Sequence, residues 1–341
     1  MPLGWAIVST GRHPDTKMAP AIADAPEATL AAVVSRDAGR AQAFAKKHNA
    51  AAAYTDLPTM LRDPAVDVVY VASPNALHAD HVVMAAAAGK HVLVEKPMAL
   101  SLADCDRMID ACAVADVQLG VGFHLRTHPG HRRVRDLIAN GDLGTVALTT
   151  ANWGRGTRGQ VAPASRPALQ AWWDDPKMVG AGAFMATGVH CVDLMRFVLG
   201  REVTEVTALT DATPEHPLEE LLVMALRFDD GSMGAVMTGR RTPDYAGNSI
   251  MAYGSGGRAG VRESIAMVLA GTLDIYSDAL SVDEAFALDP TALYTWQVDA
   301  FNDAVAHDGR PAATGLDGLR AAQITLAMVE SARTGKRVDI G

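Results

Sequence analysis

The chain has 341 residues, which is enough for two domains when a domain takes roughly 150 residues. Hydrophobic residues make up 49% of the sequence and charged residues 20%, a balance that supports large aliphatic cores and excludes an intrinsically disordered chain. The net charge of -9 is spread along the sequence without a basic run, so we expect no nucleic acid among the partners.

The first 122 residues alternate short strand-like runs with amphipathic helix-like runs. The predicted strands are Trp5–Ser9, Thr29–Val34, Ala51–Tyr54, Val66–Ala72, His91–Glu95 and Gln118–Val121. The predicted helices between them are Lys17–Asp24, Asp37–His48, Leu57–Arg62, Ala76–Ala88 and Leu102–Ala115. Such an alternation predicts a doubly wound parallel sheet of the Rossmann type, with helices on both faces.

After about Thr145 the pattern changes to consecutive strands separated by turns. The predicted strands are Val146–Trp153, Glu202–Leu209, Leu221–Phe228, Ser232–Thr238 and Ser249–Tyr253. This succession predicts a mostly antiparallel sheet. Two late helices, near Leu293–Ala306 and Leu316–Ala332, either pack on this sheet or return to the first domain. We therefore expect an α/β chain with a Rossmann domain at residues 1–122 and a second α/β domain at residues 123–341.

The turn after the first predicted strand is a candidate site for the pyrophosphate of a dinucleotide. Small residues are needed there because the backbone passes close to the phosphates at a helix N-terminus. The turn reads Ser9-Thr10-Gly11-Arg12, and against a G-x-x-G-x-G pattern only Gly11 is a glycine, with Ala6 and Ser9 at the other two positions. The spacing alone fits an ordinary strand-to-helix turn as well. The place of the turn at the start of a βαβ unit favours the dinucleotide.

The end of the second predicted strand bears on the choice between NAD and NADP. An Asp or Glu at this point would bind the ribose 2′-hydroxyl of NAD. This chain has Ser35-Arg36 instead, with Arg40 one turn later. A guanidinium binds a 2′-phosphate bidentately, whereas a carboxylate would repel it. NADP is therefore the favoured cofactor, and NAD stays acceptable if Arg36 stacks on adenine or faces solvent.

Two more loops follow the fourth and fifth predicted strands, at the carboxyl edge of a parallel sheet where ligands bind. The candidate cofactor-binding residues in them are Ser73, Pro74, Asn75, His78, Glu95, Lys96 and Pro97. A lysine at a strand end, followed by a proline, is held rigidly, partly desolvated and close to the cofactor. The alternative is a surface lysine beside a turn.

These motifs resemble the Gfo/Idh/MocA oxidoreductases, a family named for glucose–fructose oxidoreductase and inositol dehydrogenase. The later motifs that carry the resemblance are Gly180-Ala181-Gly182 and Gly188-Val189-His190-Cys191-Val192-Asp193. The stretches Gly89–Pro97 and His124–Arg126 are similar to the 1,5-anhydrofructose reductase subgroup. The resemblance implies that the second domain is built on an open, largely antiparallel sheet, whose exposed face commonly forms the interface of a homodimer or homotetramer.

The resemblance also implies an NAD(P)-dependent oxidoreductase. It would move hydride between the nicotinamide and a hydroxyl or carbonyl carbon of a sugar, polyol or related small molecule. Lys96 and His190 would face the nicotinamide, with the substrate between them. They are the candidate catalytic residues, because oxidation of an alcohol leaves a proton that a base must accept. A lysine near a cationic nicotinamide loses its proton more easily than in water, and histidine titrates close to neutrality already.

Two positions depart from the family pattern. Ala186 stands where the family usually has an Asp one helical turn before the histidine, and Asp193 either supports His190 from the other side or forms an ion pair within its helix. A Trp172-Trp173 pair stands where many relatives have Trp-Arg, which favours a less polar substrate. The candidate substrate-binding residues are His124, Arg126, Trp172, Trp173, Thr187 and His190.

Two alternatives to this function stay open. One is a non-catalytic NAD(P)-binding regulator of the same fold, which the loss of the Asp at position 186 favours and the presence of Lys96 and His190 opposes. The other is an enzyme that uses NAD(P) transiently around an elimination step.

The remaining residue patterns indicate no further cofactor and no membrane. Histidine pairs such as His78 and His81 have helical spacing but no third ligand, so no metal is expected. Cys105, Cys112 and Cys191 have no C-x-x-C spacing and are expected to be buried thiols. The apolar runs are shorter than the ~20 residues of a membrane span, and no signal-like segment is present, so a cytoplasmic location is expected.

Overall fold

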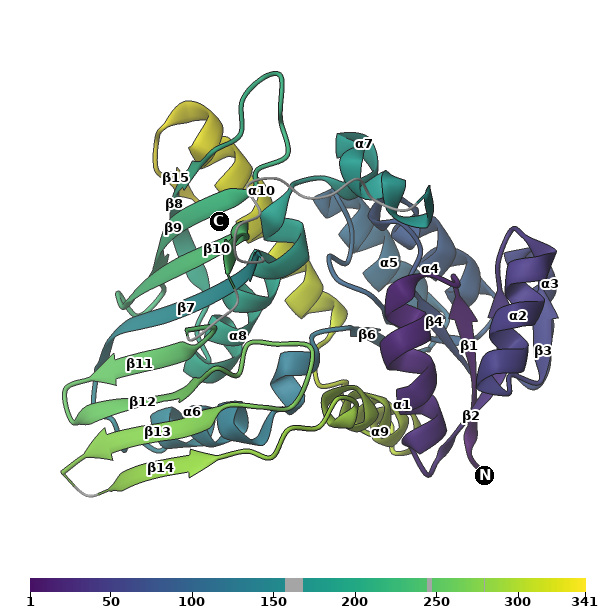
Figure 1. Ribbon diagram of the computed structural model, residues 1–341, viewed down its shortest axis with the longest axis horizontal. Helices are drawn as coiled ribbons and strands as arrows, with labels where there is room; N and C mark the ends of the chain where they lie inside the picture. Colours follow the sequence, from purple (N-terminus) through teal and green to yellow (C-terminus); the bar gives the residue numbers. More distant parts are fainter. Residues whose placement is uncertain (157–167, 244–246, 279) are drawn as a thin grey trace. The chain divides into compact units, whose positions relative to one another are not determined.

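The computed structural model describes residues 1–156, 168–243, 247–278 and 280–341. It separates the chain into two compact units (Figure 1). Unit 1 consists of Met1–His124 and Thr291–Ala322, and unit 2 consists of Leu125–Pro290 and Gln323–Gly341. The segment Thr291–Ala322, for which the sequence left two placements open, therefore belongs to the unit that begins the chain.

Unit 1 is built on a six-stranded sheet in the order β3-β2-β1-β4-β5-β6. Its strands are β1 (Leu3–Val8), β2 (Ala28–Val34), β3 (Ala52–Tyr54), β4 (Val68–Val71), β5 (His91–Val94) and β6 (Leu119–Val121). All neighbouring pairs are parallel. This strand order belongs to the Rossmann fold, in which ligands bind beyond the carboxyl ends of β1 and β4. The predicted Rossmann sheet is confirmed.

The helices of unit 1 follow their strands as predicted. They are α1 (Ala19–Asp24), α2 (Ala38–His48), α3 (Leu57–Leu61), α4 (His78–Ala87), α5 (Leu102–Val114) and α9 (Ala292–Ala306). Two helix N-termini are capped by side chains, since Asp37 accepts the N–H of Arg40 at 2.8 Å and Ser101 accepts that of Asp104 at 3.1 Å. Side-chain oxygens thereby satisfy amides that the first helical turn leaves unpaired.

Helix α9 completes the core of unit 1. The indole N–H of Trp5 on β1 donates to the side-chain oxygen of Asn302 at 3.0 Å. Phe301 packs edge-on against the same indole, with ring centroids 5.7 Å apart. The late helix is thus part of the hydrophobic core around β1, together with Tyr294 and Val298.

Unit 2 is built on a nine-stranded sheet in the order β14-β13-β12-β11-β7-β10-β9-β8-β15. Its strands are β7 (Val146–Gly156), β8 (Val203–Thr210), β9 (Leu221–Phe228), β10 (Met233–Pro243), β11 (Ile250–Gly254), β12 (Gly257–Arg262), β13 (Thr272–Ser277), β14 (Ser281–Ala285) and β15 (Val338–Asp339). Every pair is antiparallel except β10 with β7. The mostly antiparallel sheet is confirmed, although the sequence prediction missed β12 to β15, because β12 is glycine-rich, β14 is polar and β15 is very short.

One face of the nine-stranded sheet is covered by helices and the other carries exposed apolar side chains. The helices of unit 2 are α6 (Pro129–Ala139), α7 (Pro176–Val179) and α8 (Val189–Leu199), and α6 and α8 pack against the sheet (Figure 1). A further helix, α10 (Gly315–Thr334), starts in unit 1 and ends in unit 2. The opposite face, here called the open face, carries Leu209, Val223, Met233, Met237, Tyr253 and Tyr276.

The three cysteines and one long apolar helical stretch are buried inside the protein. Cys105, Cys112 and Cys191 are free and buried as predicted, and burial raises the pKa of each thiol to about 12. Among the described residues, the helical stretch Pro176–Leu199 is long and apolar enough to span a membrane, but 89% of its most apolar window is buried inside the protein. Such burial is typical of a core helix.

Candidate functional site

The turn after β1 holds a serine in a backbone conformation that is typical of glycine. Ser9 has a φ of 117°, in the left-handed region that glycine adopts easily and other residues adopt at a cost of about 1–3 kcal/mol. Its hydroxyl accepts the backbone N–H of Gly11 at 3.2 Å. Thr10, Gly11 and Arg12 follow at the carboxyl edge of the sheet, immediately before the first helical segment. This backbone fits a pyrophosphate at a helix N-terminus.

The end of β2 lies next to this turn. The hydroxyls of Thr10 and Ser35 are 3.5 Å apart, so the sheet brings these two predicted cofactor residues together. Arg36 is exposed at the same strand end. Arg40 is also exposed, and its guanidinium lies 3.5 Å from the carboxylate of Asp37. Because Asp37 partly neutralises Arg40, Arg36 is the stronger candidate for binding a 2′-phosphate.

The loop after β4 is tied to the loop after β5 through a buried histidine. His78 is fully buried, with Nδ1 2.9 Å from the carbonyl oxygen of Pro97 and Nε2 2.9 Å from that of Ser73. Burial lowers its pKa, against the opposite effect of the two carbonyl groups. A neutral ring has one N–H and donates to one of these carbonyls at a time. We therefore expect His78 to act on the cofactor through the loops that hold Pro74 and Asn75, rather than by contact.

Glu95 and Lys96 lie at the carboxyl end of β5, where the sequence motif predicts them. Lys96 is half-buried and its peptide bond to Pro97 is cis. Glu95 is buried and accepts the hydroxyl hydrogen of Tyr70 at 2.6 Å and the backbone N–H of Lys96 at 3.3 Å. Gly122 packs against this carboxylate, since a Cβ at that position would lie 2.8 Å from Oε1. The turn that presents Lys96 is therefore built on a buried carboxylate.

A cluster of rings that the sequence analysis missed adjoins Glu95. His13 Nε2 lies 3.2 Å from Glu95 Oε1. Tyr294 of α9 contacts His13 edge-on at 5.3 Å, and His124 stacks on Tyr294 with ring centroids 4.6 Å apart. His13 could have been noticed in the sequence, because it follows Gly11 of the turn after β1 by two residues. Tyr294 lies on α9, and no local sequence pattern connects that helix with β5. His124, predicted to bind substrate, is buried in this cluster.

In unit 2, a capped turn leads into the helix that carries His190. The carboxylate of Glu219 accepts the N–H groups of Gly182 and Phe184, each at 2.8 Å. A Cβ at position 182 would lie 2.0 Å from the carbonyl oxygen of Glu219, so this approach requires glycine. Burial raises the pKa of Glu219, against the opposing effect of these two hydrogen bonds. The π-helical turn Phe184–Gly188 follows and continues into α8.

His190 is buried one residue into α8, with its ring 5.1 Å from that of Trp153 on β7. Within residues 181–190, all of which the structure describes, Ala186 is the position that is not buried. Thr187 is fully buried, donates to the carbonyl oxygen of Ala183 at 2.9 Å and contacts the hydroxyl of Thr238. Thr187 thus holds the turn to the sheet, and we expect it to act on a substrate only through that turn.

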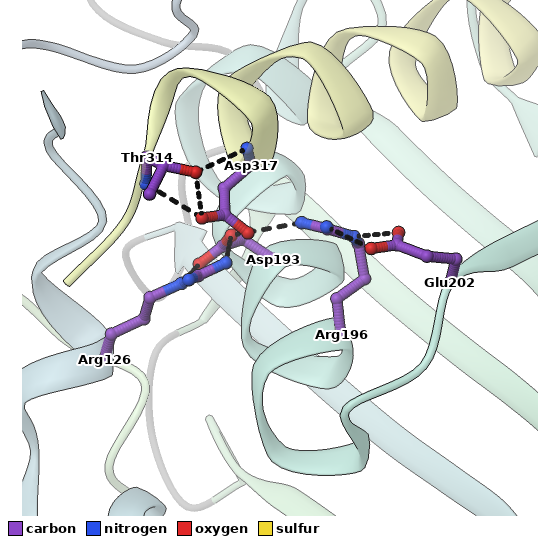
Figure 2. Close-up of polar contacts among 6 residues, drawn as sticks. All are labelled: Arg126, Asp193, Arg196, Glu202, Thr314 and Asp317. Atoms are coloured by element: carbon purple, nitrogen blue, oxygen red, sulfur yellow. Dashed lines mark hydrogen bonds and ion pairs between the residues drawn. The ribbon is translucent and has the colours of Figure 1, made fainter. Parts of the chain in front are cut away.

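Asp193 is held by two arginines (Figure 2). Arg126 donates to its carboxylate through Nε at 2.9 Å and through Nη2 at 2.6 Å, and both side chains are almost fully buried. Arg196 approaches the same carboxylate at 3.7 Å and makes a bidentate pair with Glu202, at 2.7 Å for both bonds. Asp193 makes an ion pair within its helix, with Arg196, and a closer one with Arg126 from outside that helix. Arg126, predicted to bind substrate, is engaged in that pair.

Two aromatic features lie elsewhere in unit 2. Trp172 and Trp173 stack with ring centroids 4.5 Å apart and are half-exposed. A hollow of about 390 Å³ is bordered by the indole of Trp153, which also contacts His190. Its other lining residues are Arg155, Gly247, Asn248, Glu263, Ala266, Met267 and Val268. Trp153 was predicted only as part of a strand, and its position beside His190 follows from the structure alone.

The described part of the chain has no group of three or more His, Cys, Asp and Glu side chains that is arranged to hold a metal ion. His128 and His131, which have helical spacing, are both buried and stack on each other at 4.3 Å. His131 Nδ1 lies 2.9 Å from the carbonyl oxygen of Leu125. These rings are therefore packed into the core of unit 2.

The chain is similar to known oxidoreductases over almost its whole length. Residues 3–123 match the Gfo/Idh/MocA oxidoreductase family with its NAD-binding Rossmann fold, and residues 131–260 match the C-terminal domain of that family. The sequence is 31% identical over 313 residues to 1,5-anhydro-D-fructose reductase of Ensifer adhaerens, covering 91% of each chain. It is 31% identical over 316 residues to D-xylose 1-dehydrogenase (NADP(+)) 2 of Haloferax volcanii, covering 93% of each chain. The fold is similar to the crystal structure of aldose-aldose oxidoreductase from Caulobacter crescentus, with a TM-score of 0.88 and 24% identity, covering 99% of this chain and 100% of that one.

Proposed function

Because the chain belongs to the Gfo/Idh/MocA oxidoreductase family, we propose that this NAD(P)-dependent oxidoreductase acts on a hydroxyl or carbonyl carbon of a sugar, polyol or related small molecule. The observation that carries the proposal is Lys96, held at the carboxyl end of β5 by the buried Glu95. The relatives described above support it, since two of them are named as a reductase and a dehydrogenase of carbohydrates.

Lys96 and His190 are the proposed proton-handling residues. When bound, the nicotinamide supplies or accepts the hydride. In the oxidising direction a neutral Lys96 accepts the proton that the substrate hydroxyl loses, and in the reducing direction the lysine ammonium returns it. His190 is the second proposed residue, because its ring nitrogens can exchange a hydrogen bond or a proton with a substrate. Its ring packs against that of Trp153, with centroids 5.1 Å apart.

We assign the 2′-phosphate of NADP to Arg36, with Ser35 beside it. Arg36 is exposed at the end of β2, and Ser35 lies 3.5 Å from Thr10 of the pyrophosphate turn. The two residues that follow β2, Ser35 and Arg36, are not acidic, so no carboxylate stands there to bind a ribose 2′-hydroxyl. The next residue, Asp37, caps α2 and pairs with Arg40. These contacts favour NADP over NAD.

The hollow beside Trp153 is the proposed position of the distal part of the substrate. An indole face packs well against the C–H face of a sugar ring, and Arg155 and Glu263 border the hollow with polar groups suited to hydroxyls. The stacked pair Trp172 and Trp173 offers a second aromatic surface in the same unit. This lining fits a hydroxylated ring with one apolar face.

The open face of unit 2 is the proposed interface of a homodimer or homotetramer. Leu209, Val223 and Met237 are opposite one another on three neighbouring strands, and each is more than half exposed. A contiguous apolar surface of this kind on a sheet is typical of a protein interface. A second copy of the same face can cover it symmetrically.

A turnover experiment tests the proposal. NADPH with keto-sugars, and NADP⁺ with sugars and polyols, are incubated with the protein while nicotinamide absorbance is followed. We expect turnover, and we expect Lys96→Ala to lower kcat/KM by about 10²–10⁴ while cofactor binding persists. Lys46→Ala, an exposed lysine on α2, is the matched control and keeps full activity.

The same experiment distinguishes the alternative function. Ala186 favours a non-catalytic NAD(P)-binding regulator, because an alanine stands where members of the family usually have an aspartate. Tight NADPH binding without turnover across a broad panel of sugars, polyols and other carbonyl compounds would support the regulator and refute the enzyme.

A further inference from the structure

The connection between β12 and β13 is long for two neighbouring antiparallel strands. It consists of residues 263–271, here called the β12–β13 loop, whereas such strands are commonly joined by about two to five residues. Arg262 pairs with Thr272 at its base. Glu263 and Gly271, at its two ends, have positive φ angles of 55° and 104°. Loops that a rigid sheet presents in this way often carry binding residues.

The β12–β13 loop forms part of the hollow beside Trp153. The lining residues that it supplies are Glu263, Ala266, Met267 and Val268. Its backbone is bonded to neighbouring segments, since the N–H of Ile265 donates to the carbonyl oxygen of Asn248 at 3.0 Å and that of Leu269 donates to Asp289 at 2.8 Å. The loop thus provides a mainly apolar wall, and the position of its backbone sets the shape of the hollow.

His131 of α6 holds the start of this loop. Its Nε2 lies 2.8 Å from the hydroxyl oxygen of Ser264, and both residues are fully buried. Its Nδ1 lies 2.9 Å from the carbonyl oxygen of Leu125, and it carries a hydrogen because a carbonyl only accepts. The Ser264 hydroxyl also lies 3.0 Å from the carbonyl oxygen of Val261. The imidazole therefore connects α6 with the first buried residue of the loop.

His128 holds the other end of the loop. Its Nδ1 accepts the backbone N–H of Gly130 at 3.0 Å and so caps α6. Because a backbone amide always donates, the hydrogen of the neutral ring is on Nε2, which donates it to the carbonyl oxygen of Ala270 at 2.9 Å. Burial lowers the pKa of His128, against the opposing effect of the Ala270 carbonyl. The neutral ring thus uses both nitrogens, one for the helix and one for the loop.

The two imidazoles are packed tightly against each other and against an aromatic ring. Their centroids are 4.3 Å apart, and Phe286 contacts His128 edge-on at 4.9 Å. A Cβ at position 130 would lie 2.8 Å from Cε2 of Phe286, so the first turn of α6 approaches this ring as closely as a glycine allows. Such packing leaves the imidazoles little room to move. Both ends of the loop are therefore held from the first turn of one helix.

We propose that His128 and His131 are positioning residues for the substrate, because they hold the two ends of the β12–β13 loop and thereby fix one wall of the hollow. The inference rests on the proposed function in one respect, namely that the hollow takes the distal part of the substrate. A substrate that packs on Met267 and Val268 binds only while the loop is in place, so its apparent affinity falls with the fraction of molecules in that state. Since Lys96 and His190 are not part of the loop, the histidine pair acts on KM and leaves kcat unchanged.

Hydrogen exchange of the full-length, cofactor-free protein tests the attachment of the loop without any turnover. Asparagine is among the best N-cap residues, so His128→Asn keeps the cap of α6, but its side chain is too short to bond Ala270 as well. We expect amides in peptides spanning 264–271 to exchange roughly threefold to tenfold faster in this variant, which is the effect of one hydrogen bond on an equilibrium. Peptides spanning 130–139 should exchange as in the wild type. Deuterium uptake is measured by mass spectrometry.

Two further variants complete the exchange experiment. Ser264→Ala removes the contact with His131 at the start of the loop, and it should accelerate exchange of the same peptides by a similar factor. His216→Asn changes an exposed histidine of the same unit and should leave the loop unaltered. Unaltered loop exchange in either His128→Asn or Ser264→Ala would overturn the inference. Exchange that becomes faster in α6 as much as in the loop would also overturn it, because His128 would then serve the helix alone.

Steady-state kinetics provide the second measurement, with the substrate that turns over fastest in the panel described above. His128→Asn and Ser264→Ala should each raise KM for this substrate about threefold to tenfold, with kcat and KM for NADPH unchanged. Faster loop exchange with an unchanged KM contradicts the link to the substrate and overturns the inference.

The two measurements separate this inference from the proposed function. A wild type without turnover contradicts the proposed function, and the exchange result then decides whether the histidines hold the loop. Turnover that depends on Lys96, with loop exchange and KM both unaltered in the two variants, contradicts the inference alone.

Discussion

Ser9 occupies a backbone position where the dinucleotide-binding pattern has a glycine. Ser9 adopts a φ of 117° where a glycine is usual, and its own hydroxyl satisfies the N–H of Gly11. The turn thereby keeps its shape at a cost of about 1–3 kcal/mol, which the neighbouring strands β1 and β4 must offset. An eroded glycine pattern consequently does not mean a lost nucleotide site.

The choice of cofactor is a prediction at this scale. Arg36→Ala removes the exposed guanidinium at the end of β2 and should raise KM for NADPH about tenfold or more, with a much smaller change for NADH, because a charged hydrogen bond to phosphate contributes about 1.5–3 kcal/mol. Initial rates with both cofactors give the comparison. Arg40→Ala is the matched control, since Arg40 is paired with Asp37 and should matter less. Equal effects of Arg36→Ala on the two cofactors would refute its contact with the 2′-phosphate.

At the scale of elements, α8 is tethered by charges. Arg126 comes from the segment after β6 and reaches Asp193, 67 residues further along the chain. Arg196, one turn beyond Asp193, continues the chain of charges to Glu202 (Figure 2). Because Asp193 lies one turn after His190, the tether limits how far that histidine can move. A buried pair of this kind specifies position more than it adds stability.

The tether predicts an asymmetry between breaking and replacing the ion pair. Asp193→Ala leaves a buried guanidinium without its carboxylate and should lower the free energy of unfolding by about 3–5 kcal/mol, whereas the double variant Arg126→Met with Asp193→Leu should recover much of the loss. Urea unfolding of the three proteins measures both values. Arg201→Ala breaks an exposed pair with Asp230 and should cost no more than about 1 kcal/mol. A double variant as unstable as Asp193→Ala would contradict this account of the tether.

At the scale of the whole molecule, the two units have different surfaces. The Rossmann sheet of unit 1 is buried on both faces by helices, as parallel sheets generally are. The antiparallel sheet of unit 2 has one face covered by α6 and α8, and strand β9 alternates buried and exposed residues along its length. Leu209, Val223 and Met237 on β8, β9 and β10 are exposed and apolar, so association of copies through this face would remove them from water.

The open face therefore predicts the oligomeric state. Val223→Glu places a charge in the middle of the apolar row and should convert a dimer or tetramer into a smaller species, because an unpaired charge in an interface is strongly unfavourable. Sedimentation velocity distinguishes the species. Leu288→Glu makes the same kind of change at an exposed apolar residue outside the strands, and it should leave the assembly intact. A wild type that sediments as a monomer would contradict the proposed interface.

Much of the fold could be predicted from the sequence because its signals are local. Alternating apolar runs placed all six strands of unit 1 within two residues of their observed ends. The strands β12, β14 and β15 were missed because they are glycine-rich, polar or very short. The strand β13 was missed although Leu273 and Ile275 alternate with exposed or half-buried residues. The site was predictable only where a short motif contained it, as in Glu95-Lys96-Pro97.

The sequence by itself determined the Rossmann unit, the antiparallel sheet and the presence of Lys96 and His190, because strand periodicity, helix caps and short motifs are written in neighbouring residues. Only the tertiary structure decided that His13 pairs with Glu95, that Asp193 belongs to Arg126, and that Tyr294 joins the first unit. These contacts join residues far apart in the chain, and their formation depends on which faces pack together in the core. The charge state of a buried carboxylate follows from that packing, so no reading of neighbouring residues could supply it.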